Sequence, residues 1–280
     1  MKREGEKWIV FMFLPPYFCL NLMPITSPVS VRPITQKEFG KIDYHVMRLA
    51  FDSQNALGRL CDEVIYHNDL AARIEAAGFG PVRKEARVCV SHRDFAKVYS
   101  LDLVVADSAI YELKTDSCFV PDHDAQLLNY LLLRDTSHGK LINFRPSQVQ
   151  SRFVNTTLTL EERHRLTFHT DRWREDESAS SLLRNTFVAL LQDWGGFLEL
   201  PLYLEALVHF LGGAEQVPLI RDGIALGNQH FHLLTPEVAF RLTAMPSMSS
   251  DYERQLQSLL NLTTLRRFQW INMAHHEVPL

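Results

Sequence analysis

The stretch SLDLVVADSAIYELKTD, residues 100–116, decides the fold, because it places three charged side chains inside two apolar runs. Asp102 stands in the first run, and Glu112 and Lys114 stand in the second. The two runs predict neighbouring β-strands joined by a turn around Asp107-Ser108. Side chains two positions apart on a strand point to the same face of the sheet, so Glu112 and Lys114 lie side by side.

The length of this turn determines whether Asp102 shares that face. A two-residue turn pairs Asp102 with Leu113 and directs Asp102 and Glu112 to opposite faces of the sheet. A turn with an odd number of residues, or a bulge, directs both carboxylates to the same face. A site therefore requires the second arrangement, and the alternative interpretation of the three charges is a solvated strand face with a cross-strand ion pair.

A shared face has a chemical consequence. Two carboxylates in close contact repel each other unless a cation neutralises them. Hard oxygen ligands with open positions suit Mg²⁺ or Mn²⁺, which retain water molecules and accept phosphate oxygens as further ligands. An adjacent lysine can orient or deprotonate an attacking water. These residue types therefore fit the metal-assisted hydrolysis of a phosphodiester.

The flanking sequence predicts an α/β fold with a mixed sheet. Apolar residues recur at three- and four-residue intervals over 35–78, where Thr35 and Glu38 form a capping-box pattern. Strand-like alternation follows at 82–94, and a helical pattern at 121–139 precedes the strand KLINF. The order helix, three-strand meander, helix, strand predicts a mixed sheet with helices on its faces.

Two further residues give the strand pair its context. Glu63 lies on the predicted helix before the sheet, and Gln126 lies in the first turns of the helix after it. With the ExxY pattern at 63–66, the series DLVV…IYELK…QLLNYL…GKLINF resembles the PD-(D/E)XK nuclease superfamily, and more narrowly its GxxExxY branch. The resemblance covers residues 44–155. Leu60 stands where the glycine of the branch is expected.

The resemblance implies a restriction-endonuclease-like core and a metal-dependent nuclease that hydrolyses nucleic acid, with DNA as the preferred substrate. It also implies a metal site for Mg²⁺ or Mn²⁺. The ligands would be the carboxylates of Asp102 and Glu112, with the backbone carbonyl of Leu113 as a third ligand.

The other candidate residues take their roles from the same resemblance. Lys114 would act on the attacking water, and Glu63 would orient a water or assist a second cation. Gln126 would position Lys114 or the substrate. Tyr66 and Tyr130 are weaker candidates, because tyrosines in such patterns are typically core residues whose hydroxyl reaches the surface.

The chain divides into three parts by composition. Residues 1–33 are predicted to be a poorly ordered leader, or an extension ahead of a start at Met23. The apolar run in this segment is broken by Pro15-Pro16 and is too short to cross a membrane. Residues 34–155 form the predicted core, and residues 156–280 form a C-terminal α+β extension.

The extension has recognisable elements but no motif that identifies its role. Two helical patterns each end in Gly-Gly, and a turn is predicted at Asp222-Gly223. A helix opened by Thr235-Pro236, a final helix DYERQLQSLLNL and a strand LRRFQWINM follow. The apolar helices could cover the sheet, form a homodimer or recognise a target.

The charge of the chain restricts its partners only weakly. The formal net charge is -4, so the whole chain has no basic footprint for nucleic acid. Arg134, Lys140 and Arg145 fall where a basic rim would contact a phosphate backbone, although scattered cations are common on any surface. Four scattered cysteines without a CxxC pair predict reduced thiols and a cytoplasmic protein. The alternative to an enzyme is a catalytically silent nuclease-fold binding or scaffold protein.

Overall fold

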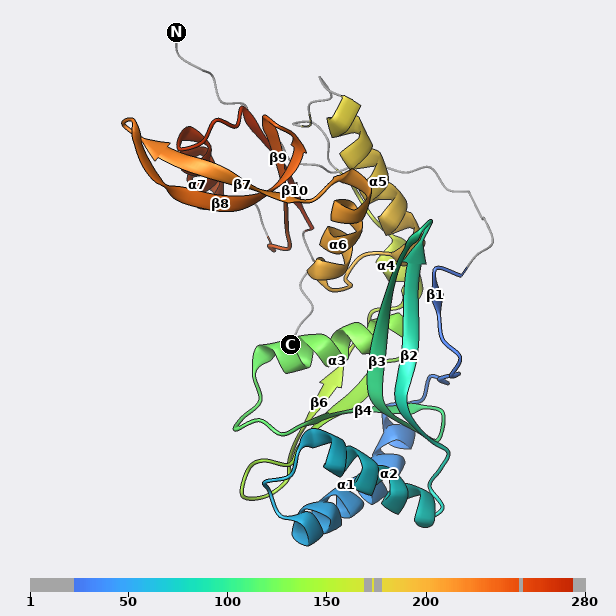
Figure 1. Cartoon of the computed structure of the whole chain (residues 1–280). Helices are drawn as coiled ribbons and strands as arrows, with labels where there is room; N and C mark the ends of the chain where they lie inside the picture. Colours follow the sequence, from blue (N-terminus) through green and yellow to red (C-terminus); the bar gives the residue numbers. More distant parts are fainter. Residues whose placement is uncertain (1–22, 169–172, 174–177, 247–248, 274–280) are drawn as a thin grey trace. The chain divides into compact units, whose positions relative to one another are not determined.

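The computed structural model describes residues 23–168, 173, 178–246 and 249–273 (Figure 1). The helices are α1 Gln36–Leu57, α2 Glu63–Ala76, α3 Pro121–Leu133, α4 Leu160–His164, α5 Ser178–Trp194, α6 Leu200–Leu211 and α7 Ser250–Asn261. The strands are β1 Ile25–Thr26, β2 Val82–His92, β3 Phe95–Val105, β4 Ala109–Lys114, β5 His138–Asn143, β6 Gln150–Asn155, β7 Ala214–Arg221, β8 Ile224–Thr235, β9 Val238–Thr243 and β10 Arg267–Asn272.

The chain forms two compact units. The N-terminal unit comprises Leu22–Arg163 together with Phe197–Glu199. The C-terminal unit contains α5, α6 and all later elements. Most of the predicted leader, residues 1–22, lies outside the described residues.

The N-terminal unit contains the predicted meander and crossover. Its six strands lie in the order β1-β2-β3-β4-β5-β6, and β2, β3 and β4 pair antiparallel. Helix α3 then connects β4 to β5, which pair in parallel. The mixed α/β fold class is thus confirmed. The sequence did not reveal β1, which has two residues, or β6, whose side chains are mostly exposed and therefore lack an apolar pattern.

The predicted helical region over 35–78 consists of two helices. The capping box predicted at its start is present, since the Thr35 hydroxyl accepts the Glu38 N–H and the Glu38 carboxylate accepts the Thr35 N–H. Gly58 ends α1 with a φ of 75°, a left-handed conformation that favours glycine. The chain then turns, and α2 begins at Glu63.

Helices cover both faces of this sheet (Figure 1). α1 and α2 pack on the face that carries Leu103 and Tyr111. α3 packs on the opposite face, where an added Cβ at Gly139 would meet the side chains of Leu127 and Leu131 at 3.0–3.1 Å. Alternation along β4 therefore directs Glu112 and Lys114 towards the α3 face.

The C-terminal unit has a four-stranded sheet in the order β10-β9-β8-β7. The predicted turn at Asp222-Gly223, the final helix and the final strand are present as the β7–β8 turn, α7 and β10. The helix predicted from Thr235-Pro236 is wrong, because residues 238–243 form β9. This segment, VAFRLT, pairs in parallel with β10, and Pro236 lies in the turn before it.

The packing of the C-terminal unit follows from its apolar residues. α7 lies over a cluster that includes Val217, Phe231 and Phe268. In contrast, Ile224 and Leu226 near the β7–β8 turn are exposed. Among the helices that the structure describes, none has both the length and the hydropathy needed to cross a lipid bilayer.

Candidate active site

The turn between β3 and β4 contains three residues, Ala106–Ser108. Ala106 and Asp107 have positive φ angles of 53° and 46°, which close this turn. The resulting register pairs Leu103 with Tyr111, and its continuation sets Asp102 beside Glu112. The odd residue count therefore places the two carboxylates on a shared face, and the alternative with opposed faces does not occur.

Asp102 occupies an irregular point of β3. All residues from Phe95 to Val105 except Asp102 have a partner on β2. The Asp102 side chain instead accepts the Leu113 N–H at 2.8 Å, and its backbone carbonyl contacts His67 Nε2 at 2.5 Å. Burial raises the pKa of the Asp102 carboxyl, and the Leu113 N–H partly offsets this effect.

Glu112 and Lys114 form a buried ion pair on β4. Lys114 Nζ donates to Glu112 Oε1 at 2.7 Å, and the two side chains are 12% and 2% exposed respectively. Burial and the neighbouring Asp102 raise the pKa of Glu112 to about 8. Burial alone would lower the pKa of Lys114, but the contact with Glu112 raises it. Within the described residues, Glu112 Oε2 is buried and has no hydrogen-bond partner.

Glu63 is the first residue of α2, and its carboxyl lies within electrostatic range of Lys114 and Asp102. Burial raises the pKa of its carboxyl, whereas the nearby Lys114 ammonium lowers it. Arg145 holds the loop before α2, because its guanidinium donates to the carbonyls of Arg59 at 2.6 Å and Thr115 at 2.9 Å. The start of α2 is thereby fastened to the segment that follows Lys114.

Tyr130 of α3 lies within electrostatic range of the two carboxylates, and Gln126 is joined to this region through Tyr130. Gln126 Nε2 donates to the Tyr130 hydroxyl at 3.0 Å. Burial raises the pKa of Tyr130, and the charges of Glu112, Asp102 and Lys114 also act on it. The structure therefore brings these two residues to the same site as the carboxylates.

Tyr66 has different surroundings. Its hydroxyl donates to the Gly58 carbonyl at 2.7 Å, and its ring stacks on Phe144 with 4.6 Å between ring centroids. Tyr66 thus ties the end of α1 to α2 and the sheet. These contacts of Tyr66 lie within the core.

His67 is a residue of this region that the sequence did not single out. It lies four positions after Glu63, so both are on one face of α2. This four-residue spacing was the sequence feature that could have indicated His67. The contact itself could not be inferred, because it joins His67 to a backbone carbonyl 35 positions away.

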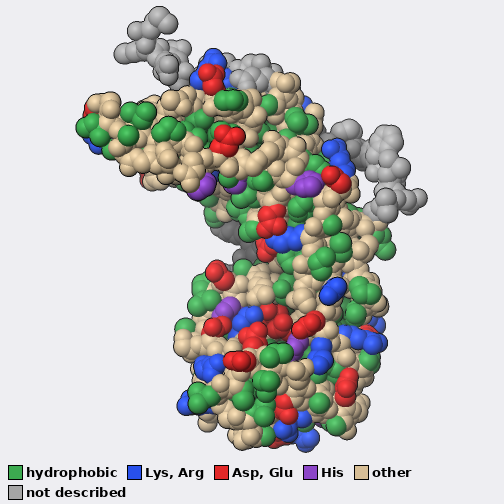
Figure 2. Space-filling model, in the orientation of Figure 1, with side chains coloured by type: hydrophobic (Ala, Val, Ile, Leu, Met, Phe, Trp, Pro, Cys, Tyr) green, Lys and Arg blue, Asp and Glu red, His purple; other side chains and the backbone are tan. Residues whose placement is uncertain are grey.

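The expected basic rim does not form. Lys140 is only 5% exposed and donates to Asp43 Oδ2 at 2.6 Å. Arg134 donates to the Val29 carbonyl at 2.7 Å, and Arg145 binds loop carbonyls as described above. Figure 2 shows acidic and basic side chains interspersed on the visible face of this unit. The expectation of a rim is wrong because these cations satisfy acceptors of the chain itself.

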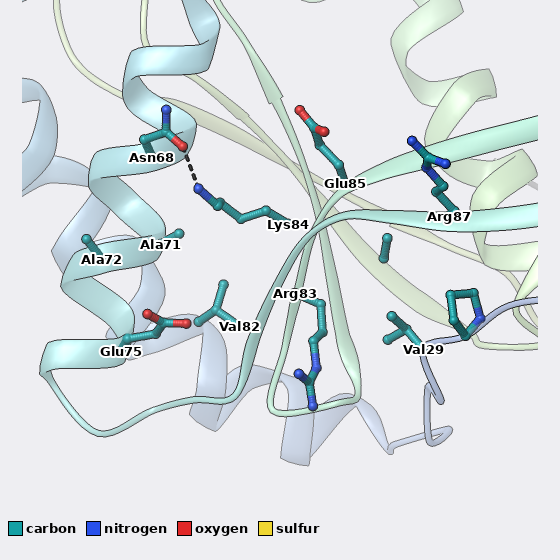
Figure 3. Close-up of a pocket in the computed structure, with 12 residues that line it drawn as sticks. Val29, Asn68, Ala71, Ala72, Glu75, Val82, Arg83, Lys84, Glu85 and Arg87 are labelled. Atoms are coloured by element: carbon teal, nitrogen blue, oxygen red, sulfur yellow. Dashed lines mark hydrogen bonds between the residues drawn. The ribbon is translucent and has the colours of Figure 1, made fainter.

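A cavity of about 520 Å³ lies between α2, β2 and the segment before α1 that contains Val29 (Figure 3). Lys84 reaches across it to Asn68 Oδ1 at 2.6 Å, and Arg83 pairs with Asp107 at 3.3 Å. Two of the basic side chains that line the cavity are therefore bound to residues of the chain itself. Asp102 and Glu112 are not among the residues that line this cavity.

The donor set fits a hard divalent cation with few protein ligands. No group of three or more His, Cys, Asp and Glu side chains within the described residues is arranged to hold a metal. Asp102 and Glu112 supply two carboxylates. In a β-strand the carbonyl and the N–H of one residue share an edge, so strand geometry directs the Leu113 carbonyl to the edge where its N–H donates to Asp102. Mg²⁺ is commonly held by one or two carboxylates with water and substrate phosphate as further ligands.

Comparisons with known proteins bear on the N-terminal unit. No curated protein matched the chain significantly. The crystal structure of SSO0001 matched with 18% sequence identity, over 44% of this chain and 79% of that chain, with a TM-score of 0.27. Residues 40–154, which carry all of the candidate site residues, match the family model of the PD-(D/E)XK nuclease superfamily.

Proposed function

We propose that the N-terminal unit hydrolyses nucleic-acid phosphodiesters with a divalent metal ion, with DNA as substrate and Mg²⁺ as the ion. The observation that carries the proposal is the buried, unpartnered Oε2 of Glu112 beside Asp102. With both carboxyls ionised the site would carry two negative charges, of which Lys114 offsets only one. A divalent ion held by both carboxylates and the Leu113 carbonyl would compensate the remaining charge.

Within the superfamily we assign the chain to the GxxExxY branch. The support is the ExxY pattern at 63–66, which begins α2. Glu63 lies within electrostatic range of Lys114 and Asp102, and Tyr66 anchors the same helix to Gly58. In this assignment Gly58, which ends α1, serves as the glycine of the pattern although it lies two residues early.

Each protein residue has a distinct part in the proposed reaction. A bound divalent ion would polarise the scissile phosphate and stabilise the developing negative charge. Lys114 has a raised pKa and remains an ammonium, so it orients the attacking water and offsets charge instead of removing a proton. As the water oxygen bonds to phosphorus, the bond to the leaving oxygen breaks. Glu63 accepts a proton from the attacking water, and the leaving oxyanion takes a proton from solvent water. Gln126 and Tyr130 align the phosphate from α3.

A catalytically silent binding protein is the second candidate function. The observation that favours it is the engagement of Lys140, Arg134 and Arg145 within the chain, which removes three expected contacts to a nucleic-acid backbone. Such a protein would keep the charged pocket without turning over a substrate.

Incubation with circular DNA and with RNA, in Mg²⁺, Mn²⁺ or EDTA, separates the two functions. The enzyme should cleave DNA with either metal ion and not in EDTA. Lys114→Ala and Glu112→Gln should each lower the cleavage rate by about 100-fold or more, as the loss of a transition-state contact does. Lys41→Ala, an exposed lysine of α1, is the matched control and should cleave at the wild-type rate.

Cleavage that persists in EDTA, or that is equal in wild type and Glu112→Gln, would contradict the proposal. The absence of any cleavage in wild type with both ions would support the silent binding protein.

A further inference from the structure

Asp102 of β3 is unpaired in the β2–β3 ladder, and so is Glu85 of β2. Glu85, which lies opposite Asp102 in the strand register, has a φ of 49°, a conformation that non-glycine residues seldom adopt in a strand. The strands pair normally on both sides of this point, at Lys84–Leu103 and Ala86–Leu101. The two strands are thus kinked together at one position, and the backbone of Asp102 is removed from the β2–β3 ladder.

The kink separates two packing environments. Leu103, on one side of it, belongs to the core cluster beneath α1 and α2. Tyr99, on the other side, packs edge-on against Tyr130 of α3. On a regular strand Tyr99 and Leu103, four positions apart, would share a face, so the face that these positions present changes at the kink, where Asp102 lies.

A buried carbonyl that leaves its ladder must find another donor. His67 supplies this donor, since its Nε2 lies 2.5 Å from the Asp102 carbonyl oxygen. A carbonyl can only accept, so this ring nitrogen must carry the hydrogen. His67 is 7% exposed. The adjacent Asn68 accepts a bond from Lys84, so consecutive residues of α2 contact both strands at the kink (Figure 3).

Asp102 is consequently held at two atoms. His67 fixes its backbone from α2, and the Leu113 N–H fixes Oδ2 from β4. We propose that His67 is a positioning residue, which sets the Asp102 carboxylate in the orientation that a divalent ion requires. This inference rests on the proposed metal-dependent function and adds a residue that acts through Asp102 and not on the substrate.

The test uses two amide substitutions that differ in reach. His67→Gln can place an amide N–H near the position of Nε2, whereas the shorter His67→Asn cannot. Leu70→Ala is the control, because Leu70 is buried one turn further along α2 and lies in the apolar cluster. Two quantities are measured in each full-length variant. They are the affinity for Mn²⁺ by calorimetry, and the hydrogen-exchange rate of the Leu113 amide without metal.

His67→Asn should weaken Mn²⁺ binding by about 10- to 100-fold, as the loss of residues that orient metal ligands does. It should also speed exchange of the Leu113 amide, because Asp102 is then free to turn away. His67→Gln should restore both quantities to within a few-fold of wild type. Leu70→Ala should lower the melting temperature and leave Mn²⁺ affinity unchanged.

The inference is overturned if His67→Asn binds Mn²⁺ and protects the Leu113 amide as wild type does. It is also overturned if Leu70→Ala weakens Mn²⁺ binding as much as His67→Asn, since the effect would then reflect stability alone. Wild type that binds no Mn²⁺ would refute the proposed function. The exchange rate of the Leu113 amide would still decide whether His67 positions Asp102.

Discussion

Asp102 combines a structural contact with a proposed chemical one. One carboxylate oxygen accepts the Leu113 N–H, and the carboxylate charge contributes to the raised pKa of Glu112. The two contributions can be separated by substitution, because an asparagine amide oxygen can still accept the N–H but carries no charge.

Asp102→Asn should therefore remain close to wild type in stability, while Asp102→Ala should lose about 1–3 kcal/mol by leaving the Leu113 N–H unpaired. Both variants should lose divalent-ion affinity. Denaturant unfolding gives the stabilities, and calorimetry gives the affinities. Equal stability of the two variants would show that the bond to Leu113 contributes nothing.

Glu112 predicts a pH dependence for the stability of the metal-free protein. Its pKa in the folded protein is about 8, against an ordinary value of 4.5. The folded state therefore binds the proton more tightly, and stability falls as pH rises between these two values. Each pKa unit corresponds to about 1.4 kcal/mol, so the loss is several kcal/mol.

Glu112→Gln should remove this slope and be more stable than wild type near pH 8 in EDTA. The measurement is the free energy of unfolding at a series of pH values between about 5 and 8. Parallel pH profiles for wild type and Glu112→Gln would be inconsistent with the raised pKa.

The sequence predicted part of this residue-scale arrangement. The proximity of Glu112 and Lys114 follows from strand alternation alone. The contact of His67 with Asp102 does not, because it depends on a kink that frees one backbone carbonyl. The burial of Lys140 could not be predicted either, since its partner Asp43 lies 97 positions away.

At the scale of elements, the three-residue turn Ala106–Ser108 sets the geometry of the site. Deletion of Asp107 would leave two residues and shift the β3–β4 register by one position. The side chains of Glu112 and Lys114 would then turn towards the face that α1 and α2 cover. The deletion variant should lose divalent-ion affinity and much of its stability.

Asp107→Gly is the matched control, because it keeps the turn length and suits the positive φ of this position. It should bind Mn²⁺ as wild type does and differ little in melting temperature. Full Mn²⁺ affinity in the deletion variant would mean that register does not assemble the site.

Element types were easier to predict than their connections. The meander, α3 and β5 have strong apolar periodicity and were predicted, whereas the turn length was left undecided. β9 was predicted as a helix because Thr235-Pro236 resembles a helix start, although VAFRLT forms a strand beside β10. Tertiary pairing determined this element, and local sequence could not reveal it.

At the scale of the molecule, the N-terminal unit includes a segment that follows α5 in the chain. Phe197–Glu199 belongs to this unit, and the Glu199 carboxylate accepts the Tyr99 hydroxyl at 2.6 Å and Lys97 Nζ at 3.0 Å. Its backbone N–H donates to Asn129. The sequence did not indicate that Phe197–Glu199 would join this unit, because these contacts join positions 70 to 102 residues apart.

Glu199→Ala should therefore destabilise the N-terminal unit by about 1–2 kcal/mol, through the loss of partly buried hydrogen bonds. Divalent-ion affinity should be unchanged, since Glu199 is not in the proposed ligand set. Hydrogen exchange of the β3 amides reports this stability. Glu215→Ala, an exposed glutamate of β7, is the control, and equal exchange rates in both variants would contradict the role of Glu199.

The central claim is that Asp102, Glu112 and the Leu113 carbonyl bind a hard divalent cation next to Lys114. Calorimetric titration of wild type and Glu112→Gln with Mg²⁺ and with Mn²⁺ tests it most directly. Binding by wild type in the millimolar range or tighter, and its loss in Glu112→Gln, is the predicted result. No binding by wild type, or equal binding by both proteins, would contradict the account.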